Sequence, residues 1–208
     1  MPPDLAALND DAGYLAFKSR DARFDGKFFV GVTSTGVYCR PVCRVKTPKR
    51  ENCRFFAHAA LAESAGFRPC LRCRPELAPQ HLDMAWSIED ASKILARQAV
   101  ALLSDIALSG EKAHVAQVAT RLGVSERHLR RIVAAELGVS PLQWMQTRRL
   151  LCAKQLLTDT QLPIHDVAQI SGFGSARRFN AAFLQHYALQ PHRLRQSSPI
   201  HTQLEVNA

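Results

Sequence analysis

Two short stretches, Cys39-Arg40-Pro41-Val42-Cys43 and Cys70-Leu71-Arg72-Cys73, decide how the first part of this chain folds. Each carries a pair of thiols, spaced C-x3-C and C-x2-C, and two such pairs can close on one tetrahedral metal ion, most often zinc. A site of this kind often serves only to hold a fold together. Dense basic surroundings favour instead a site that meets a phosphate backbone. The basic side chains here are Arg40, Arg44, Lys46, Lys49, Arg50, Arg54, Arg68, Arg72 and Arg74.

The length and charge of the chain limit its class. Its 208 residues suffice for one large domain or two modest ones, and 47% hydrophobic residues can form a core. The formal charge of +9 favours nucleic acid as the partner over a membrane, because the chain has no long apolar run and no lipidation motif. A merely soluble basic protein is the alternative on charge alone.

The first residues indicate the compartment. They lack the basic start and apolar stretch of a signal peptide, and carry Asp4, Asp10 and Asp11. We therefore expect a cytoplasmic, nucleoid-associated protein whose cysteines are thiols or metal ligands rather than disulfides. Outside the two pairs, Cys152 is expected to be a small core residue and Cys53 a buried residue without a role.

Residues 1–78 are predicted to form a small α+β domain with a thin core. Such a domain often needs its metal as part of its folding energy, so we expect the first half to fold poorly without zinc. The patterns predict helices over 11–20 and 57–65, strands over 28–32, 37–39 and 55–56, and a polar turn over 33–36. In the first helix, Tyr14, Leu15 and Phe17 are expected to point inward.

Residues 28–75 resemble the N-terminal domain of the Ada family. The resemblance is carried by Thr35-Gly36-Val37-Tyr38-Cys39-Arg40-Pro41-Val42-Cys43, Arg50-Glu51-Asn52 and the run from Ala65 to Cys73. It implies one zinc ion held by Cys39, Cys43, Cys70 and Cys73. It also implies that Cys39 takes a methyl group, irreversibly and once, from a methylphosphotriester in DNA.

Elementary electrostatics is consistent with that role. Four thiolates around one dication leave two net negative charges, and the zinc keeps the sulfurs deprotonated at neutral pH. Methylation removes one of these charges, so repulsion from DNA falls and repair becomes a switch for DNA binding. Around the site, Thr35, Arg44, Lys46 and Arg50 are candidate contacts to the DNA backbone. A solvated basic face is the alternative for them.

The second half contains an internal repeat. The pattern Val118-Ala119-x3-Gly123-x-Ser125 recurs as Val167-Ala168-x3-Gly172-x2-Ser175, with an offset of 49 before the turn and 50 after it. Each copy predicts a helix, a turn with a left-handed glycine, and a second helix capped by serine, which is the plan of a helix-turn-helix.

One long helix is predicted before the first copy, over residues 88–108, and another is predicted between the two copies, over residues 141–158. In the second of these, Trp144, Leu150, Leu151, Leu156 and Leu157 are expected in the core and Thr147-Arg148-Arg149 on a polar face. We expect an all-α domain over residues 88–195, with a linker over 79–87, including a helical turn at 81–86, and a polar tail over 196–208.

The second helix of each copy has a basic start, as a helix in the major groove requires. Leu129, Val133, Phe179 and Phe183 are expected in the core. Chance solvated charge is the alternative for the basic residues. The candidate DNA contacts are Arg127, His128, Arg131, Ser175, Arg177, Arg178 and Asn180.

The tandem pattern resembles the DNA-binding domain of the AraC/XylS family over residues 85–195. Ile164-His165-Asp166-Val167-Ala168 and Ser171-Gly172-Phe173-Gly174-Ser175 are its most specific parts. The resemblance implies that two helices of a monomer read successive major-groove faces about 34 Å apart.

The expected protein is therefore a single-turnover DNA repair methyltransferase that becomes a transcription activator of the alkylation response. Its expected partners are double-stranded DNA, as methylated backbone and as promoter operator, and RNA polymerase. Two alternatives remain open: a transcription regulator with a structural zinc, and a sensor of thiol oxidation. The helical half also resembles versions fused to a 3-methyladenine glycosylase, for which no residues remain, and the chain has no Pro-Cys-His-Arg motif of an alkylguanine transferase.

Overall fold

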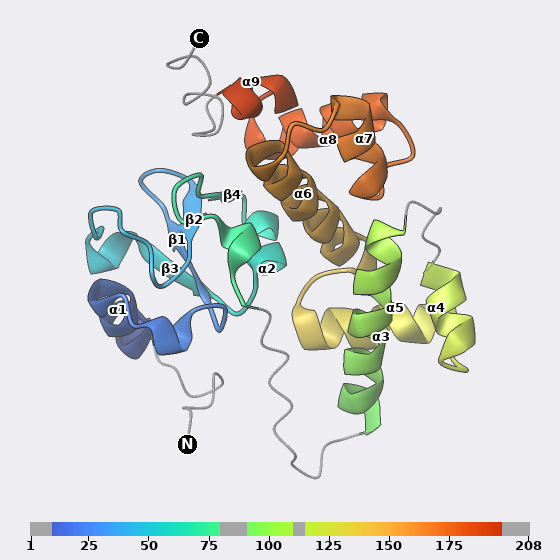
Figure 1. Ribbon diagram of the computed structural model, residues 1–208. Helices are drawn as coiled ribbons and strands as arrows, with labels where there is room; N and C mark the ends of the chain where they lie inside the picture. The colour runs from blue at the N-terminus through green and yellow to red at the C-terminus, as the bar shows by residue number, and fades with distance from the viewer. Residues whose placement is uncertain (1–9, 80–90, 110–114, 197–208) are drawn as a thin grey trace. The chain divides into compact units, whose positions relative to one another are not determined.

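The computed structural model describes residues 10–79, 91–109 and 115–196, which fall into two compact units within residues 1–86 and 87–208 (Figure 1). The first unit is a small sheet with short helices, and the second is helical, so the predicted fold class is confirmed. The predicted linker and polar tail, apart from their first residues, and the predicted turn at 81–86 lie outside the described residues.

A four-stranded sheet forms the first unit, in the order β3-β1-β2-β4. The central strand β1 pairs antiparallel with β2 and β3, whereas β4 runs parallel to β2. The turn at residues 33–36 joins β1 to β2, with Gly36 at φ +64°, as the sequence predicted. The strands are β1 (Phe29–Val32), β2 (Val37–Cys39), β3 (Cys53–Phe56) and β4 (Arg68–Pro69).

Two short helices, α1 (Asp10–Ser19) and α2 (Ala59–Ser64), pack on the sheet. Phe17 of α1 lies in one core with Phe28, Val30 and the site cysteines. The expectation that Leu15 points inward is wrong, because its residue surface is 64% exposed. At about 100° per residue, Leu15 lies on the face of α1 opposite to Phe17. Single-turn 3-10 helices lie at Ala22–Phe24, Arg50–Asn52 and Pro75–Leu77.

The last residues of the first unit, 75–79, pack back on that unit. Pro75 is buried, and Gly26, at φ +80°, lies so close to Pro79 that an added Cβ would stand 2.0 Å from its carbonyl oxygen. Gly26 is therefore required both by its left-handed backbone and by this close approach. Residues 75–79 therefore belong to this unit.

The second unit contains both predicted copies of the helix-turn-helix. In the two turns, the N–H of Val124 donates to Ala119 O (3.0 Å) and the N–H of Phe173 donates to Ala168 O (2.9 Å). The same bond at the same repeat position confirms the internal repeat. The helices are α3 (Ala91–Leu108), α4 (Val115–Arg121), α5 (Glu126–Leu137), α6 (Pro141–Asp159), α7 (Ile164–Ile170), α8 (Ala176–Tyr187) and α9 (Pro191–Gln196).

Each copy has its own core, and α6 contributes to both. Leu129 and Val133 lie in the first core with α3, and Phe179 and Phe183 in the second, as predicted. The polar face predicted at residues 147–149 is wrong: Thr147 is buried, and the Arg149 side chain bonds to α3. The reason is that α6 is packed on several sides. Among the described helices, none is long and apolar enough to cross a bilayer.

Candidate metal centre and nucleic-acid interface

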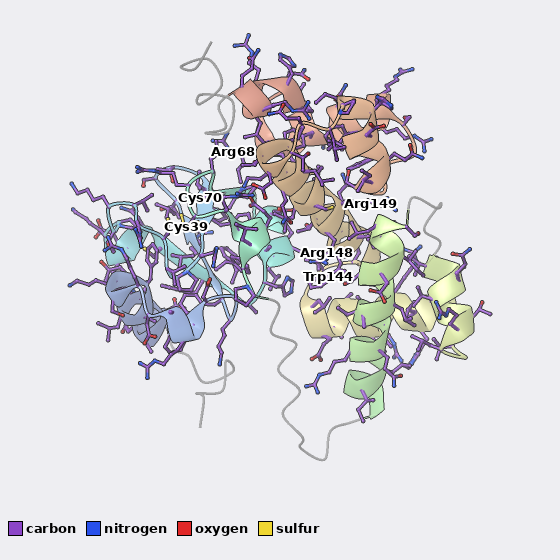
Figure 2. The ribbon with its side chains drawn as sticks, viewed as in Figure 1. Cys39, Arg68, Cys70, Trp144, Arg148 and Arg149 are labelled. Carbon is purple, nitrogen blue, oxygen red and sulfur yellow. The ribbon has the colours of Figure 1, made fainter. Side chains whose placement is uncertain are left out.

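The parallel pairing of β2 and β4 brings the two cysteine stretches together. Tyr38 lies opposite Pro69, and the N–H of Cys70 donates to Tyr38 O (2.9 Å). Neighbouring parallel strands end at the same edge of a sheet, so Cys39 and Cys70 leave β2 and β4 side by side (Figure 2). Each stretch then supplies its second thiol from the loop that follows its strand.

The four sulfurs of Cys39, Cys43, Cys70 and Cys73 all lie within 4.8 Å of one another. A tetrahedron of Zn–S bonds of about 2.3 Å needs sulfurs about 3.8 Å apart, so the cluster has the size of a tetrathiolate zinc site. The first three cysteines are buried and Cys73 is partly exposed. No disulfide joins them, as a metal site requires.

Hydrogen bonds among the thiols and from nearby backbone groups make some of the four cysteines ionise more readily than others. Hydrogen bonding from Cys39 lowers the pKa of Cys43 to about 7 and also lowers that of Cys70. Its own hydrogen bonds to Cys43, Cys70 and Cys73 raise the pKa of Cys39. A cation among these sulfurs would be needed to hold Cys39 as a thiolate.

An ion pair that the sequence did not indicate braces the two loops. Arg40 donates through Nε to Asp25 Oδ1 (2.8 Å) and through a second nitrogen to Asp25 Oδ2, and its pKa is raised by this hydrogen bonding. The same guanidinium donates to Cys73 O (3.1 Å), and the backbone N–H of Arg40 donates to Cys73 Sγ (3.3 Å). Arg40 therefore joins the first cysteine stretch to the second. Asp25 lies outside both motifs, so spacing gave no signal for it.

The candidate DNA contacts of the first unit differ in their surroundings. Thr35 is exposed at the tip of the β1–β2 turn, and Arg44 and Lys46 are exposed just beyond Cys43. Arg50 instead pairs with Asp10 (3.3 Å) and Asp11 (3.0 Å) at the start of α1, with its guanidinium 5.3 Å from the centre of the Phe55 ring. These ion pairs tie Arg50 to its own unit.

Several members of the basic set around the cysteines are likewise paired. Arg40 is bound to Asp25 as described, Lys49 lies 3.7 Å from Glu51, and Arg74 lies 3.0 Å from Glu76. The exposed members of the set are Arg44, Lys46, Lys49, Arg54, Arg68 and Arg72.

The candidate recognition helices α5 and α8 start alike. Ser125 accepts a hydrogen bond from the His128 N–H (3.2 Å), and Ser175 accepts one from the Arg178 N–H (3.3 Å), which confirms both predicted N-caps. The hydroxyl of Ser175 is thus engaged in its own helix. Of the remaining candidates, Arg127, Arg131, Arg177 and Arg178 are exposed, and His128 and Asn180 are partly buried.

The backbone of each recognition helix is fixed from behind by its core, which leaves the basic face to solvent. On α5, Arg131 lies 3.0 Å from His128 Nδ1, one turn away. Leu129 and Phe179 occupy equivalent positions on the buried faces. Both helices therefore present basic side chains near their N-termini, as binding in a major groove requires.

Comparison with known proteins covers both units. A family model described as the metal binding domain of Ada matches residues 12–76, and one described as a helix-turn-helix domain matches residues 118–197. A protein of Mycobacterium tuberculosis named "Probable bifunctional transcriptional activator/DNA repair enzyme AlkA" is 42% identical over 167 residues, which are 80% of this chain and 32% of the relative.

Two further similarities extend the comparison. The "Bifunctional transcriptional activator/DNA repair enzyme AdaA" of Bacillus subtilis is 29% identical over 195 residues, which are 93% of this chain and 86% of the relative. The solved structure titled "NMR structure of E. Coli Ada protein in complex with DNA" is 29% identical, with 71% of this chain and 96% of that chain covered and a TM-score of 0.33.

The chain spans about a third of the length of the M. tuberculosis relative and most of the B. subtilis one. The first match lies within the sheet unit, and the second covers the helical unit from α4 onward. This chain carries an Ada-type metal-binding domain followed by an AraC-type helix-turn-helix domain, and it is homologous to the bacterial Ada and AdaA proteins.

Proposed function

We propose that this protein takes a methyl group from methylphosphotriesters in DNA onto Cys39, and thereby becomes a sequence-specific activator of transcription. The observation that carries the proposal is the cluster of four sulfurs within 4.8 Å of one another in a chain that also holds a tandem helix-turn-helix. The relatives named as combined transcriptional activators and DNA repair enzymes support the same pairing of activities.

Cys39, Cys43, Cys70 and Cys73 would hold one zinc ion, which keeps its sulfur ligands deprotonated at neutral pH. The Cys39 sulfur then attacks the methyl carbon of the triester. A sulfur–carbon bond forms, the carbon–oxygen bond breaks, and its electron pair stays on the phosphate oxygen. The products are a thioether at Cys39 and an ordinary phosphate diester, so the protein is consumed in a single turnover.

Hydrogen bonds to the other sulfurs favour Cys39 as the acceptor. The N–H of Arg40 donates to Cys73 Sγ, and the N–H groups of Val45 and Cys73 donate to Cys43 and Cys70. A donated hydrogen bond stabilises a thiolate and makes its sulfur less nucleophilic. Exposure alone would favour Cys73, the partly exposed member of the set, so the location of the methyl group decides between them.

The change of charge links repair to regulation. Before reaction the metal-loaded site carries two net negative charges, and methylation leaves one, so repulsion from DNA phosphates decreases. The exposed Arg44 and Lys46 next to Cys43, and Thr35, are the proposed backbone contacts. The basic faces of α5 and α8 are proposed to read the operator as a monomer that recruits RNA polymerase, in the cytoplasm and on the chromosome.

The test is incubation of the zinc-loaded chain with duplex DNA that carries methylphosphotriesters, followed by mass analysis. We expect the gain of one methyl group, located on Cys39 by fragmentation of the tryptic peptide of residues 28–44. Cys39→Ala should lose the uptake, and Cys152→Ala, a change of a free thiol in the other unit, should retain it. An unchanged mass would refute the repair activity and leave a regulator with a structural zinc.

A second measurement tests the switch. Methylated protein should bind operator DNA more tightly than unmethylated protein at low salt, with a difference that narrows as salt screens the charge. Equal affinity at low salt would contradict the electrostatic mechanism. Loss of zinc under peroxide with altered DNA binding, and without methyl uptake, would instead indicate a sensor of thiol oxidation.

A further inference from the structure

Three parts of the helical unit meet at one backbone carbonyl, that of Ala107 in the last turn of α3. The Nε of Arg149, from α6, donates to Ala107 O at 2.8 Å across 42 residues of sequence. Carbonyls in the last turn of a helix lack a partner within the helix, and a cation there also meets the negative end of the helix dipole. Arg149, labelled on α6 in Figure 2, thus caps the end of α3.

The third part is the turn of the second helix-turn-helix. A Cβ added to Gly172 would stand 2.0 Å from Ala107 O and 3.1 Å from Arg149 Nε. The backbone of this turn therefore rests directly on the end of α3, beside the guanidinium. Gly123, at the equivalent position of the first copy, has no atom within 4 Å of its added Cβ. Close approach at Gly172 is thus a feature of one copy and not of the turn itself.

The contact joins the two DNA-reading modules. Ala107 belongs to the first core, with Leu129 of α5, whereas Phe173, next to Gly172, belongs to the second core, with Phe179 of α8. The chain passes from one core to the other along α6. The contact at Ala107 adds a lateral link between them, so that the second module cannot turn freely about α6.

The partial burial of Arg149 gives this link an energetic cost. Removal from water lowers the pKa of the Arg149 guanidinium, and in the described part of the chain no carboxylate forms an ion pair with it. A cation that is partly withdrawn from water without a counter-charge costs free energy on folding. A hydrogen bond to a helix end recovers only part of that loss, so the position is better explained by geometry than by stability.

We propose that Arg149 is a specificity-determining positioning residue. By holding the end of α3 against the Gly172 turn, it fixes the separation of α5 and α8, and hence the spacing of the two DNA elements that the chain binds. The inference rests on the sequence-specific DNA binding proposed above. It adds a residue that touches no DNA and yet decides which arrangement of elements is bound.

The experiment is selection of binding sites from a random-sequence duplex pool by the full, zinc-loaded chain. The wild type should select two elements at one spacing, about one helical turn apart. Arg149→Met keeps the aliphatic stem and loses the donor. It should select the same two elements over several spacings, and bind the wild-type site roughly tenfold or more weakly, because the two contacts are no longer made together at low cost. Its affinity for a duplex with one element should be unchanged.

Trp144→Phe is the matched control. Trp144 Nε1 donates to Ser104 Oγ (3.0 Å), so this variant also loses a hydrogen bond between α6 and α3, but away from the second module. It should keep the single spacing. Gly172→Ala is a second variant, which forces the turn away from Ala107 while Arg149 remains, and it should broaden the spacing as Arg149→Met does.

Circular dichroism first establishes that each variant is folded. Each outcome of the selection then supports or overturns the proposed role of Arg149. A single spacing and wild-type affinity in folded Arg149→Met would overturn the inference, as would equal broadening in Trp144→Phe. If Arg149→Met does not fold, Gly172→Ala alone decides in the same way. A wild type that enriches no sequence would refute the proposed DNA recognition itself, which is a different result from a variant that keeps its spacing.

Discussion

Asp25→Asn should weaken the metal centre although Asp25 is not a ligand. In the native protein the Asp25 and Arg40 side chains are 12% and 15% exposed, and Arg40 holds both Cys73 O and Cys73 Sγ. Without the carboxylate, Arg40 becomes a nearly buried cation without its counter-charge. The guanidinium is then no longer held in place against Cys73 O, which weakens one link between the loop that carries Cys39 and Cys43 and the loop that carries Cys70 and Cys73.

The size of the effect follows from the burial. Removing one partner of a buried pair costs about 3–5 kcal/mol, and the residual exposure here argues for the lower end, about 3 kcal/mol. If this unit folds only as it binds metal, folding and binding free energies are shared. A loss of about 3 kcal/mol is then roughly a 100-fold loss of zinc affinity, at the upper end of the 10–100-fold typical for residues that orient ligands.

The assay is a competition titration with a zinc chelator at fixed pH, for wild type, Asp25→Asn, Arg40→Met and the double variant. The double variant should recover part of the loss, because it leaves no uncompensated charge. Asp21→Asn is the control: Asp21 pairs with the exposed Arg23 two residues away, so the zinc affinity of this variant should be that of the wild type. A zinc affinity of Asp25→Asn equal to that of Asp21→Asn would refute the reasoning.

Three further outcomes are expected. Chelation of zinc should unfold the first unit and leave the helical unit folded. Circular dichroism can show that the helical unit stays folded, because most of the described helix lies there. A sharp unfolding transition of the first unit without zinc would contradict this prediction. Arg177→Ala should weaken operator binding roughly tenfold in a mobility-shift titration and leave methyl uptake intact; loss of both would show that the units depend on each other. Burial raises the pKa of the Cys152 thiol above its ordinary value. Above that ordinary value the unfolded chain releases a proton that the folded chain keeps, so stability against urea should fall as pH rises, and Cys152→Ala should reduce the slope; an identical slope in the variant would count against the shift.

Local patterns in the sequence were sufficient for most of the elements and for the four thiols that the structure brings together. Strands β1 to β3, the turn at 33–36 and the serine caps at Ser125 and Ser175 follow from propensities and spacing, which act over a few residues. The internal repeat indicated two helix-turn-helix motifs in tandem, because both copies place the same residue types at the same buried and turn positions. Cys53 is buried, as expected, while Cys152 is only partly buried.

The sequence by itself determined which residues can hold a metal and which helices can enter a groove. Only the tertiary structure decided how the two cysteine stretches meet, through parallel pairing of β2 with β4, and which groups brace them, Asp25 and Arg40. It also turned Arg149 from an expected surface residue into a link between two modules. The physical reason is that these contacts join residues 15 to 42 positions apart, and no periodicity of a helix or strand records which distant partner will neutralise a charge or accept a hydrogen bond.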